Sequence, residues 1–294
     1  MEVSIIIVNY KTPQLAKNCI DSIKKYTSGI DYEIILVDNN SGDGSEEILR
    51  KIEEINYLQS PENVGFGRAN NLGLKSAAGE WILFLNSDTL LLENSVKKML
   101  DFFKQNEDKL AIGSLGVTLI NHNNEMIHSA GDLPTVVNLL SSYVQNFFRK
   151  DFHRRKNGKE VSKYRSEIAE VGYVTGADLM VRKEVFESIE NFDPDFFMYY
   201  EDALVGQRLR QIGKKNYICN CSQIVHLEGE SFKTPNLLKR IMVEKSMFIY
   251  VKKTSGKLSY FLFRIIFMLI NFPVLILKFR RTGSWRYLKH LISF

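Results

Sequence analysis

Three apolar runs constrain the fold of this chain more than any other feature of its 294 residues. Residues 4–8, 33–37 and 81–85 are rich in β-branched and other apolar side chains, as expected of parallel strands covered on both faces. Helical spacing of apolar residues follows Pro13, and further helices are predicted over residues 45–52 and 68–77. Strands that alternate with helices in this way predict an open α/β sheet.

Polar residues follow each of these runs, directly after Val8, Val37 and Leu85. In open α/β sheets ligands bind at the carboxyl ends of the strands, so these polar residues are predicted to line one crevice. Residues 9–13 contain no glycine, which excludes both the dinucleotide-binding fingerprint and the P-loop after the first strand. The crevice must therefore bind its ligand in another way.

Four motifs occur in order at the predicted strand ends. They are residues 8–10, residues 37–45, residues 63–73 and the stretch FLNSDT at residues 84–89. The series resembles family 2 glycosyltransferases with the GT-A fold, in particular their rhamnosyltransferase-like branch, from residue 3 to about residue 232. The resemblance implies a mostly parallel, Rossmann-like sheet flanked by helices. It also implies contacts to a nucleotide-sugar donor from Val8, Asn9, Tyr10, Asp38, Asn40, Gly65, Arg68, Asn71, Asn86, Ser87 and Gly176.

A divalent cation, Mg²⁺ or Mn²⁺, is the cofactor that the resemblance implies. Asn86-Ser87-Asp88 stands where many relatives carry Asp-x-Asp, so Asp88 is expected to bind the metal and His226 to be a second ligand or a diphosphate contact. Hard cations prefer oxygen ligands, and the donor's phosphates supply the rest. Asn86 removes one negative charge, so metal affinity without nucleotide is expected to be weak. A polar turn after a buried strand is the alternative interpretation of the stretch.

Glu201 and Asp202 open a predicted helix that ends before Gly213. Acids at this position can simply cap the helix and complement its dipole. The family's matching Glu-Asp motif contains the general base, and the resemblance gives that role to Asp202, with Glu201 orienting the acceptor or the base. Relatives often carry a further Asp two residues later, where this chain has Leu204.

The predicted domains are a GT-A catalytic domain over residues 1–235 and a helical extension over residues 236–294. The catalytic domain divides into a nucleotide-sugar-binding half, 1–120, and an acceptor-binding half, 121–235. Residues 258–279 are strongly apolar, but Arg264, Asn271 and Pro273 interrupt them, and basic residues flank them on both sides. This favours a helix in the interface of an anionic membrane over a spanning helix. A helical pair packed on the catalytic domain or on a second subunit is the alternative.

The basic segment 149–165 is interpreted in three ways: as a lid over the donor diphosphate, as a contact to a lipid-diphosphate acceptor, or as a solvated loop.

Three cysteines are too few for a disulfide framework and favour a reducing compartment. Cys219, Cys221 and His226 would make an incomplete zinc site. No role is predicted for His122, His128, His153 or His290. The first apolar run has no basic leader, so no signal peptide is expected there.

The predicted function is the inverting transfer of a sugar to a hydroxyl of a glycan or lipid-diphosphate-linked acceptor in surface polysaccharide synthesis. The favoured donor is dTDP-rhamnose, from which rhamnose would be transferred. A UDP-hexose donor, a nucleotidyltransferase and an inactive nucleotide-sugar-binding module are the alternatives. The expected location is the cytoplasm, peripheral on the inner face of the cell membrane. No nucleic-acid partner is expected, and the oligomeric state stays open.

Overall fold

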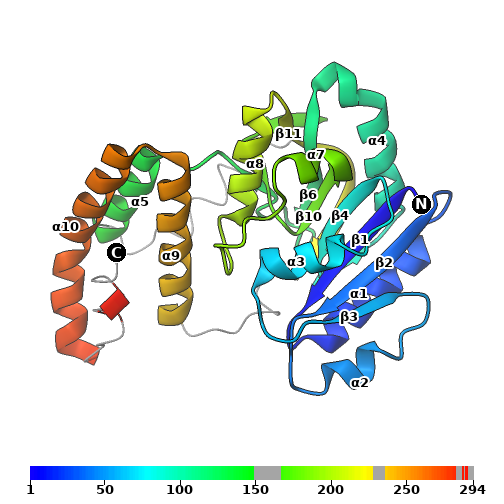
Figure 1. Ribbon diagram of the computed structural model, residues 1–294, viewed down its shortest axis with the longest axis horizontal. Coiled ribbons are helices and arrows are strands. Elements are labelled where there is room, and N and C mark those ends of the chain that lie inside the picture. Colours follow the sequence, from blue (N-terminus) through cyan, green and yellow to red (C-terminus); the bar gives the residue numbers. More distant parts are fainter. Residues whose placement is uncertain (149–166, 228–235, 283–286, 288, 291–294) are drawn as a thin grey trace.

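A computed structural model describes residues 1–148, 167–227, 236–282, 287, 289 and 290 (Figure 1). The basic segment 149–165 and residues 228–231 lie outside the described part of the chain. Among these residues, nine strands form the main sheet in the order β3-β2-β1-β4-β10-β6-β11-β5, with β8 paired to β11. These strands are β1 (Val3–Asn9), β2 (Tyr32–Asp38), β3 (Asn56–Gln59), β4 (Trp81–Asn86), β5 (Thr89–Leu91), β6 (Ile112–Ile120), β8 (Ile168–Val171), β10 (Asp178–Arg182) and β11 (Lys215–His226). Two short strands, β7 (Ala130–Gly131) and β9 (Tyr173–Val174), pair separately.

The first four strands, β3, β2, β1 and β4, are parallel, as predicted. Their register places Val8 beside both Val37 and Asn86, and Asn9 beside Asp38. The polar residues that follow the three apolar runs therefore lie at one edge of the sheet.

Beyond β4 the sheet is mixed. Strand β10 runs antiparallel to β4 and to β6, while β11 runs parallel to β6 and antiparallel to β5. The β11–β5 pairing sets His226 opposite Thr89, next to Asp88. A histidine distant in sequence thus reaches the end of β4.

Helices cover both faces of the sheet, and the side-chain alternation of β1 shows why. Ile5 and Ile7 belong to one core, under α1 (Pro13–Tyr26) and α4 (Ser95–Leu110). Ile6 belongs to the other core, under α3 (Phe66–Leu74), α7 (Lys183–Ser188) and α8 (Glu201–Gln211). Successive strand residues point to opposite faces, so a continuous apolar run fits a strand buried on both sides. The short helix α2 (Ser45–Leu49) and α3 both end earlier than predicted.

Helices α5 (Val136–Phe148), α9 (Asn236–Thr254) and α10 (Lys257–Thr282) pack together beside the sheet domain (Figure 1). Helix α10 continues through Asn271 and Pro273, which were expected to interrupt the apolar segment. Asn271 is accommodated because its side chain donates to the Phe267 carbonyl and accepts from Arg240 of α9. In the part of the chain that the structure describes, no helix is long and apolar enough to cross a membrane.

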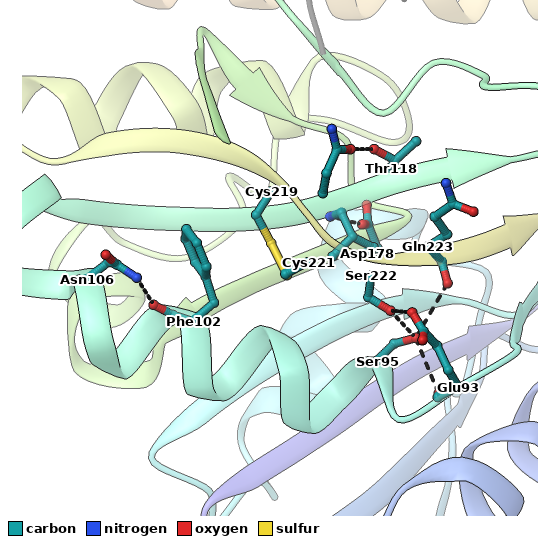
Figure 2. Close-up of a disulfide and its surroundings, with 12 residues drawn as sticks. Glu93, Ser95, Phe102, Asn106, Thr118, Asp178, Cys219, Cys221, Ser222 and Gln223 are labelled. Atoms are coloured by element: carbon teal, nitrogen blue, oxygen red, sulfur yellow. Dashed lines mark hydrogen bonds between the residues drawn. A yellow bond between two sulfur atoms is a disulfide. The ribbon is translucent and has the colours of Figure 1, made fainter. Parts of the chain in front are cut away.

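Cys219 and Cys221 form a disulfide on β11, with an S–S distance of 2.08 Å (Figure 2). The bond lies at a bulge, where the register of β11 against β6 shifts between Cys219 and Gln223. Because the two sulfur atoms are bonded to each other, they do not form the zinc site considered from the sequence. The disulfide also differs from the expectation of reduced thiols, whereas Cys19 is free and buried.

Candidate active site

A cavity of about 540 Å³ opens at the carboxyl ends of β1 and β4. Ten of the predicted site residues line it: Val8, Tyr10, Gly65, Asn86, Ser87, Asp88, Gly176, Glu201, Asp202 and His226. They come from both predicted halves of the catalytic domain. The structure therefore brings the predicted metal ligands and the predicted acidic pair into one space.

Asp88 and His226 lie next to each other on one side of the cavity. His226 Nε2 is 3.1 Å from Asp88 Oδ1 and 3.3 Å from Asn86 Nδ2. The Leu227 N–H donates to the Asp88 carbonyl, which fixes β11 against the loop after β4. Both side chains are largely buried, but both border the cavity.

The chemistry of this pair fits a divalent cation. A carboxylate oxygen and an imidazole nitrogen within 3.1 Å of each other can both turn toward one ion, and Asn86 adds an amide beside them. Within the described ranges no group of three or more His, Cys, Asp or Glu side chains could hold a metal. An ion held here therefore needs further oxygens from a bound ligand, as is usual for Mg²⁺ with phosphates.

Asp38 does not line the cavity, although it was expected to contact the nucleotide-sugar donor. Its Oδ1 accepts from Asn9 Nδ2 at 2.7 Å and from Ser41 Oγ at 2.5 Å, and its Oδ2 accepts from Gln59 Nε2 at 3.0 Å. These bonds satisfy the buried carboxylate within the protein.

Asn40, next to Asp38, is exposed and has a left-handed backbone, with φ of 57°. It too lies outside the cavity lining.

Arg68 and Asn71 also lie outside this cavity, on α3. Arg68 Nε donates to the Pro194 carbonyl at 2.7 Å. The Asn71 amide donates to the Phe192 carbonyl at 2.7 Å and accepts from the Phe192 N–H at 3.2 Å. Both side chains hold the loop that precedes the acidic pair.

Two glycines permit close approach at the cavity wall. Gly65 has φ of 86°, and a Cβ there would lie 2.2 Å from the Phe197 carbonyl oxygen. The next residue, Phe66, donates its N–H to that same oxygen at 2.8 Å. A Cβ at Gly176 would lie 2.8 Å from the ring of Phe66. The absence of a side chain at Gly176 therefore makes room for the Phe66 ring.

The acidic pair begins α8, as predicted. Tyr199 and Tyr200 both have left-handed backbones, with φ of 74° and 67°, and this turn places Glu201 and Asp202 at the cavity. Consecutive left-handed residues other than glycine are costly and occur mainly at functional sites.

Burial controls the titration of both acids. Burial raises the pKa of Glu201, and the neighbouring Asp202 carboxylate raises it further. Burial also raises the pKa of Asp202, but the Ala203 N–H, which donates to it at 2.8 Å, and the nearby His128 oppose that rise. Glu201 Oε2 is buried without a hydrogen-bond partner among the described residues. Both acids therefore hold their protons more strongly than a free carboxyl does.

Helix α9 holds the loop that carries these acids. Ser246 Oγ donates to the Met198 carbonyl at 2.6 Å, and the Tyr250 ring lies 5.6 Å from the Tyr200 ring. Lys253 forms ion pairs with Asp193 at 3.0 Å and with Asp195 at 2.7 Å. The C-terminal helices therefore form part of the support of the site.

Leu204, which stands where relatives often carry Asp, packs in the apolar core shared by α8, α9 and α10. An acid at this position would be buried among apolar side chains of these helices. Leucine in place of the family's Asp therefore suits the apolar contact between α8 and the C-terminal helices.

Several residues of the cavity were not predicted from the sequence. His128 lies near Asp202, and its Nε2 is 3.5 Å from the Tyr173 hydroxyl. Lys239, near the start of α9, is the only Lys or Arg among the described residues that line the cavity. Neither is marked by a local motif. Asn39 and Asn63, by contrast, belong to the quoted motifs, and their side chains hydrogen-bond at 2.9 Å.

Known proteins share both the sequence pattern and the fold. A poly(ribitol-phosphate) β-glucosyltransferase of Bacillus spizizenii is 35% identical over 121 residues, which is 39% of this chain and 19% of that protein. An N-acetylglucosaminyl-diphospho-decaprenol L-rhamnosyltransferase of Mycobacterium tuberculosis is 25% identical over 216 residues, 67% of each chain.

Among solved structures, Staphylococcus aureus TarS 1–349 in complex with UDP-GlcNAc has a TM-score of 0.59 at 17% identity, covering 100% of this chain and 79% of that one. GalNAc-T7 with UDP, GalNAc and Mn²⁺ has a TM-score of 0.56 at 16% identity, covering 85% and 50%. These likenesses confirm the predicted GT-A fold. The family model of glycosyl transferase family 2 matches residues 4–189, well over half of the sequence, and the chain therefore belongs to that family.

Proposed function

We propose that this chain is a metal-dependent, inverting glycosyltransferase that uses a nucleotide-diphosphate sugar as donor. The observation that carries the proposal is that one cavity of about 540 Å³ holds both the Asp88–His226 pair and the Glu201–Asp202 pair. The first pair suits a cation and a diphosphate, and the second suits a hydroxyl that must lose a proton.

The donor is proposed to lie along the ends of β1 and β4. Val8, Tyr10, Asn86 and Ser87 border this part of the cavity and can contact the nucleotide and the sugar. Asp88 and His226 would hold Mg²⁺ or Mn²⁺, which when bound neutralises charge on the diphosphate. GalNAc-T7, with which this chain shares its fold, was solved with UDP and Mn²⁺.

The acceptor hydroxyl is proposed to lie beside Asp202. As its oxygen attacks the anomeric carbon, its proton passes to the Asp202 carboxylate. A bond forms between that carbon and the acceptor oxygen, the bond to the phosphate oxygen breaks, and nucleoside diphosphate leaves. Attack from the side opposite the leaving group inverts the configuration. Glu201, with its raised pKa, stays protonated and can donate a hydrogen bond to the acceptor.

For the donor sugar we propose rhamnose from dTDP-rhamnose, with a UDP-hexose as the alternative. The rhamnosyltransferase of M. tuberculosis aligns with 67% of this chain, which favours rhamnose. The UDP-GlcNAc complex of TarS, with the same fold, favours the alternative.

For the acceptor we propose a glycan on a lipid diphosphate at the cytoplasmic face of the cell membrane. Lys239 provides a positive charge at the rim of the cavity, where the phosphates of such an acceptor could bind.

The test is the release of nucleoside diphosphate from a panel of sugar nucleotides, with and without Mn²⁺ and with a lipid-linked acceptor. Release that needs metal and acceptor supports the proposal. Pyrophosphate chemistry would instead indicate a nucleotidyltransferase, and donor binding without any product would indicate a binding module.

The variant Asp202→Asn should slow transfer by about 10²–10⁴-fold, the usual contribution of a general base, while donor binding stays nearly unchanged. Asp108→Asn, an exposed acid on α4, is the matched control and should behave like the wild type. Near-normal turnover of Asp202→Asn would show that another group accepts the proton.

A further inference from the structure

Helix α10 exposes an unusually apolar outer face. Leu258, Phe261, Leu269 and Phe272 are 71%, 56%, 67% and 60% exposed. Between them lie four more large apolar side chains that are at least 40% exposed: Leu262, Ile265, Ile266 and Met268. Their spacing of three and four residues places them along one side of the helix. We call these eight residues the α10 outer face.

The opposite side of α10 is packed against protein. Phe263 and Phe267 are fully buried, and their rings lie 5.2 Å and 5.0 Å from the ring of Phe248 on α9. The Phe267 ring also lies 4.8 Å from Tyr143 of α5. Figure 1 shows α10 at the edge of the molecule, on the far side of α9 from the sheet. The outer face therefore points away from the rest of the chain.

Charge indicates what covers this face. Residues 236–294 contain twelve Lys or Arg and a single acid, Glu244. Glu244 is itself buried, where it accepts from Arg240 at 2.6 Å and lies 2.9 Å from His290. Lys252 and Lys257, close to the start of the outer face, are exposed. The extension is therefore strongly basic in sequence, and among the described residues Lys252 and Lys257 place positive charge near the start of the apolar outer face.

We propose that the α10 outer face docks on an anionic lipid bilayer, with the helix lying in the membrane interface. Apolar side chains enter the boundary between headgroups and acyl chains, and the surrounding Lys and Arg attract the anionic headgroups. A second copy of this chain fits less well, because pairing two such faces would bring like charges together without acids to compensate them.

This inference rests on the proposed function and deepens it, because docking of α10 on a bilayer would bring the enzyme to the membrane that carries a lipid-linked acceptor. It can nevertheless be tested independently of the transfer reaction. Vesicle binding needs neither donor nor acceptor, so failure of the proposed chemistry would leave its result unchanged.

The experiment is co-sedimentation of the full chain with phosphatidylglycerol-containing vesicles and with pure phosphatidylcholine vesicles. We expect at least tenfold tighter binding to the anionic vesicles at low salt and weaker binding as salt is raised. A variant in which Leu258, Phe261, Leu269 and Phe272 are all changed to Ser should lose at least tenfold in this affinity.

The matched control changes Ile48, Leu92 and Ile212 to Ser. These residues are similarly exposed, at 46%, 51% and 49%, but lie on the sheet domain. The control should bind vesicles like the wild type, and both variants should keep the wild-type unfolding temperature and activity toward a water-soluble acceptor. The single change Leu269→Glu serves as a second, milder variant.

Two results would overturn the proposal. One is equal binding by the α10 variants and the wild type, or no binding by the wild type. The other is a wild-type dimer in sedimentation velocity that the α10 variants dissociate, which would identify a second copy as the occupant.

Discussion

The contact between Gly65 and Phe197 makes a quantitative prediction for Gly65→Ala. The glycine has φ of 86° and ψ of 175°, a combination that residues with a side chain rarely adopt. Its added Cβ would lie 2.2 Å from the Phe197 carbonyl oxygen and 2.8 Å from two other backbone atoms of Phe197. Because these are backbone atoms, no change of side-chain rotamer can relieve the contact. Either the loop at Phe197 or the start of α3 must move.

The expected loss of stability follows from these two effects. A residue held in such a backbone conformation costs about 1–3 kcal/mol, and overpacking costs about another 1–3 kcal/mol. The sum is about 2–6 kcal/mol, which for 294 residues at about 2.1 cal/mol/K of unfolding entropy per residue corresponds to a decrease in Tm of about 3–10 °C. Transfer activity should fall as well, because Phe197 and the acidic pair line the same cavity.

Thermal unfolding followed by circular dichroism measures this loss, and Gly44→Ala is the matched control. Gly44 has the same φ of 86°, but a Cβ there would meet nothing within 4 Å. The control should lose only about 1–2 kcal/mol, the usual cost of a left-handed residue. A Tm for Gly65→Ala no lower than that of Gly44→Ala would refute the steric argument.

Three further predictions concern the metal, the base and a buried acid. Chelation should stop transfer, and Asp88→Asn should raise the Mn²⁺ concentration for half-maximal activity by more than the roughly 10–100-fold that changes outside the ligand shell cause; an unchanged Mn²⁺ titration would exclude Asp88 as a ligand. Since burial raises the pKa of Asp202 and His128 opposes this rise, the rate should fall as pH falls through that pKa, and His128→Asn should move this decrease to higher pH in a pH–rate profile; a shift to lower pH would contradict the electrostatic role. Burial raises the pKa of Asp178 to about 7 in the folded protein. The folded protein is therefore destabilised as pH rises from the lower pKa of Asp178 in the unfolded chain toward 7, because only the unfolded chain releases the proton freely in that range. The Tm advantage of Asp178→Asn over the wild type should grow over that range and level off above it, and a constant difference would show that Asp178 does not titrate there.

The central strands, and the edge of the sheet at which the cavity opens, could be predicted because each apolar run is a local sequence pattern. Each apolar run is a strand buried on both faces, and a parallel register puts the ends of such runs at one edge. Asp88, His226 and the acidic pair were found through motifs whose position relative to the strands is fixed by the family fold.

The rest could not be predicted because it depends on contacts between distant segments. Asn71 belongs to a donor-site motif, but its amide bonds to Phe192, 121 residues away. Asp38 ends a strand as predicted, yet Asn9, Ser41 and Gln59 satisfy its carboxylate. His128 reaches the cavity without any motif around it. A sequence pattern shows which residue types are present but does not show which neighbours occupy their hydrogen bonds.

The contacts of α9 with the loop of residues 193–200 affect what can be learned from a truncated chain. A fragment ending before residue 236 would keep every residue of the family motifs but lose Ser246, Tyr250 and Lys253. The loop with the strained tyrosines before Glu201 would then be held only from the α3 side, by residues such as Arg68 and Asn71. Kinetic constants measured on such a fragment would reflect a loop that has lost its contacts with α9. The catalytic domain is therefore better studied together with its C-terminal helices.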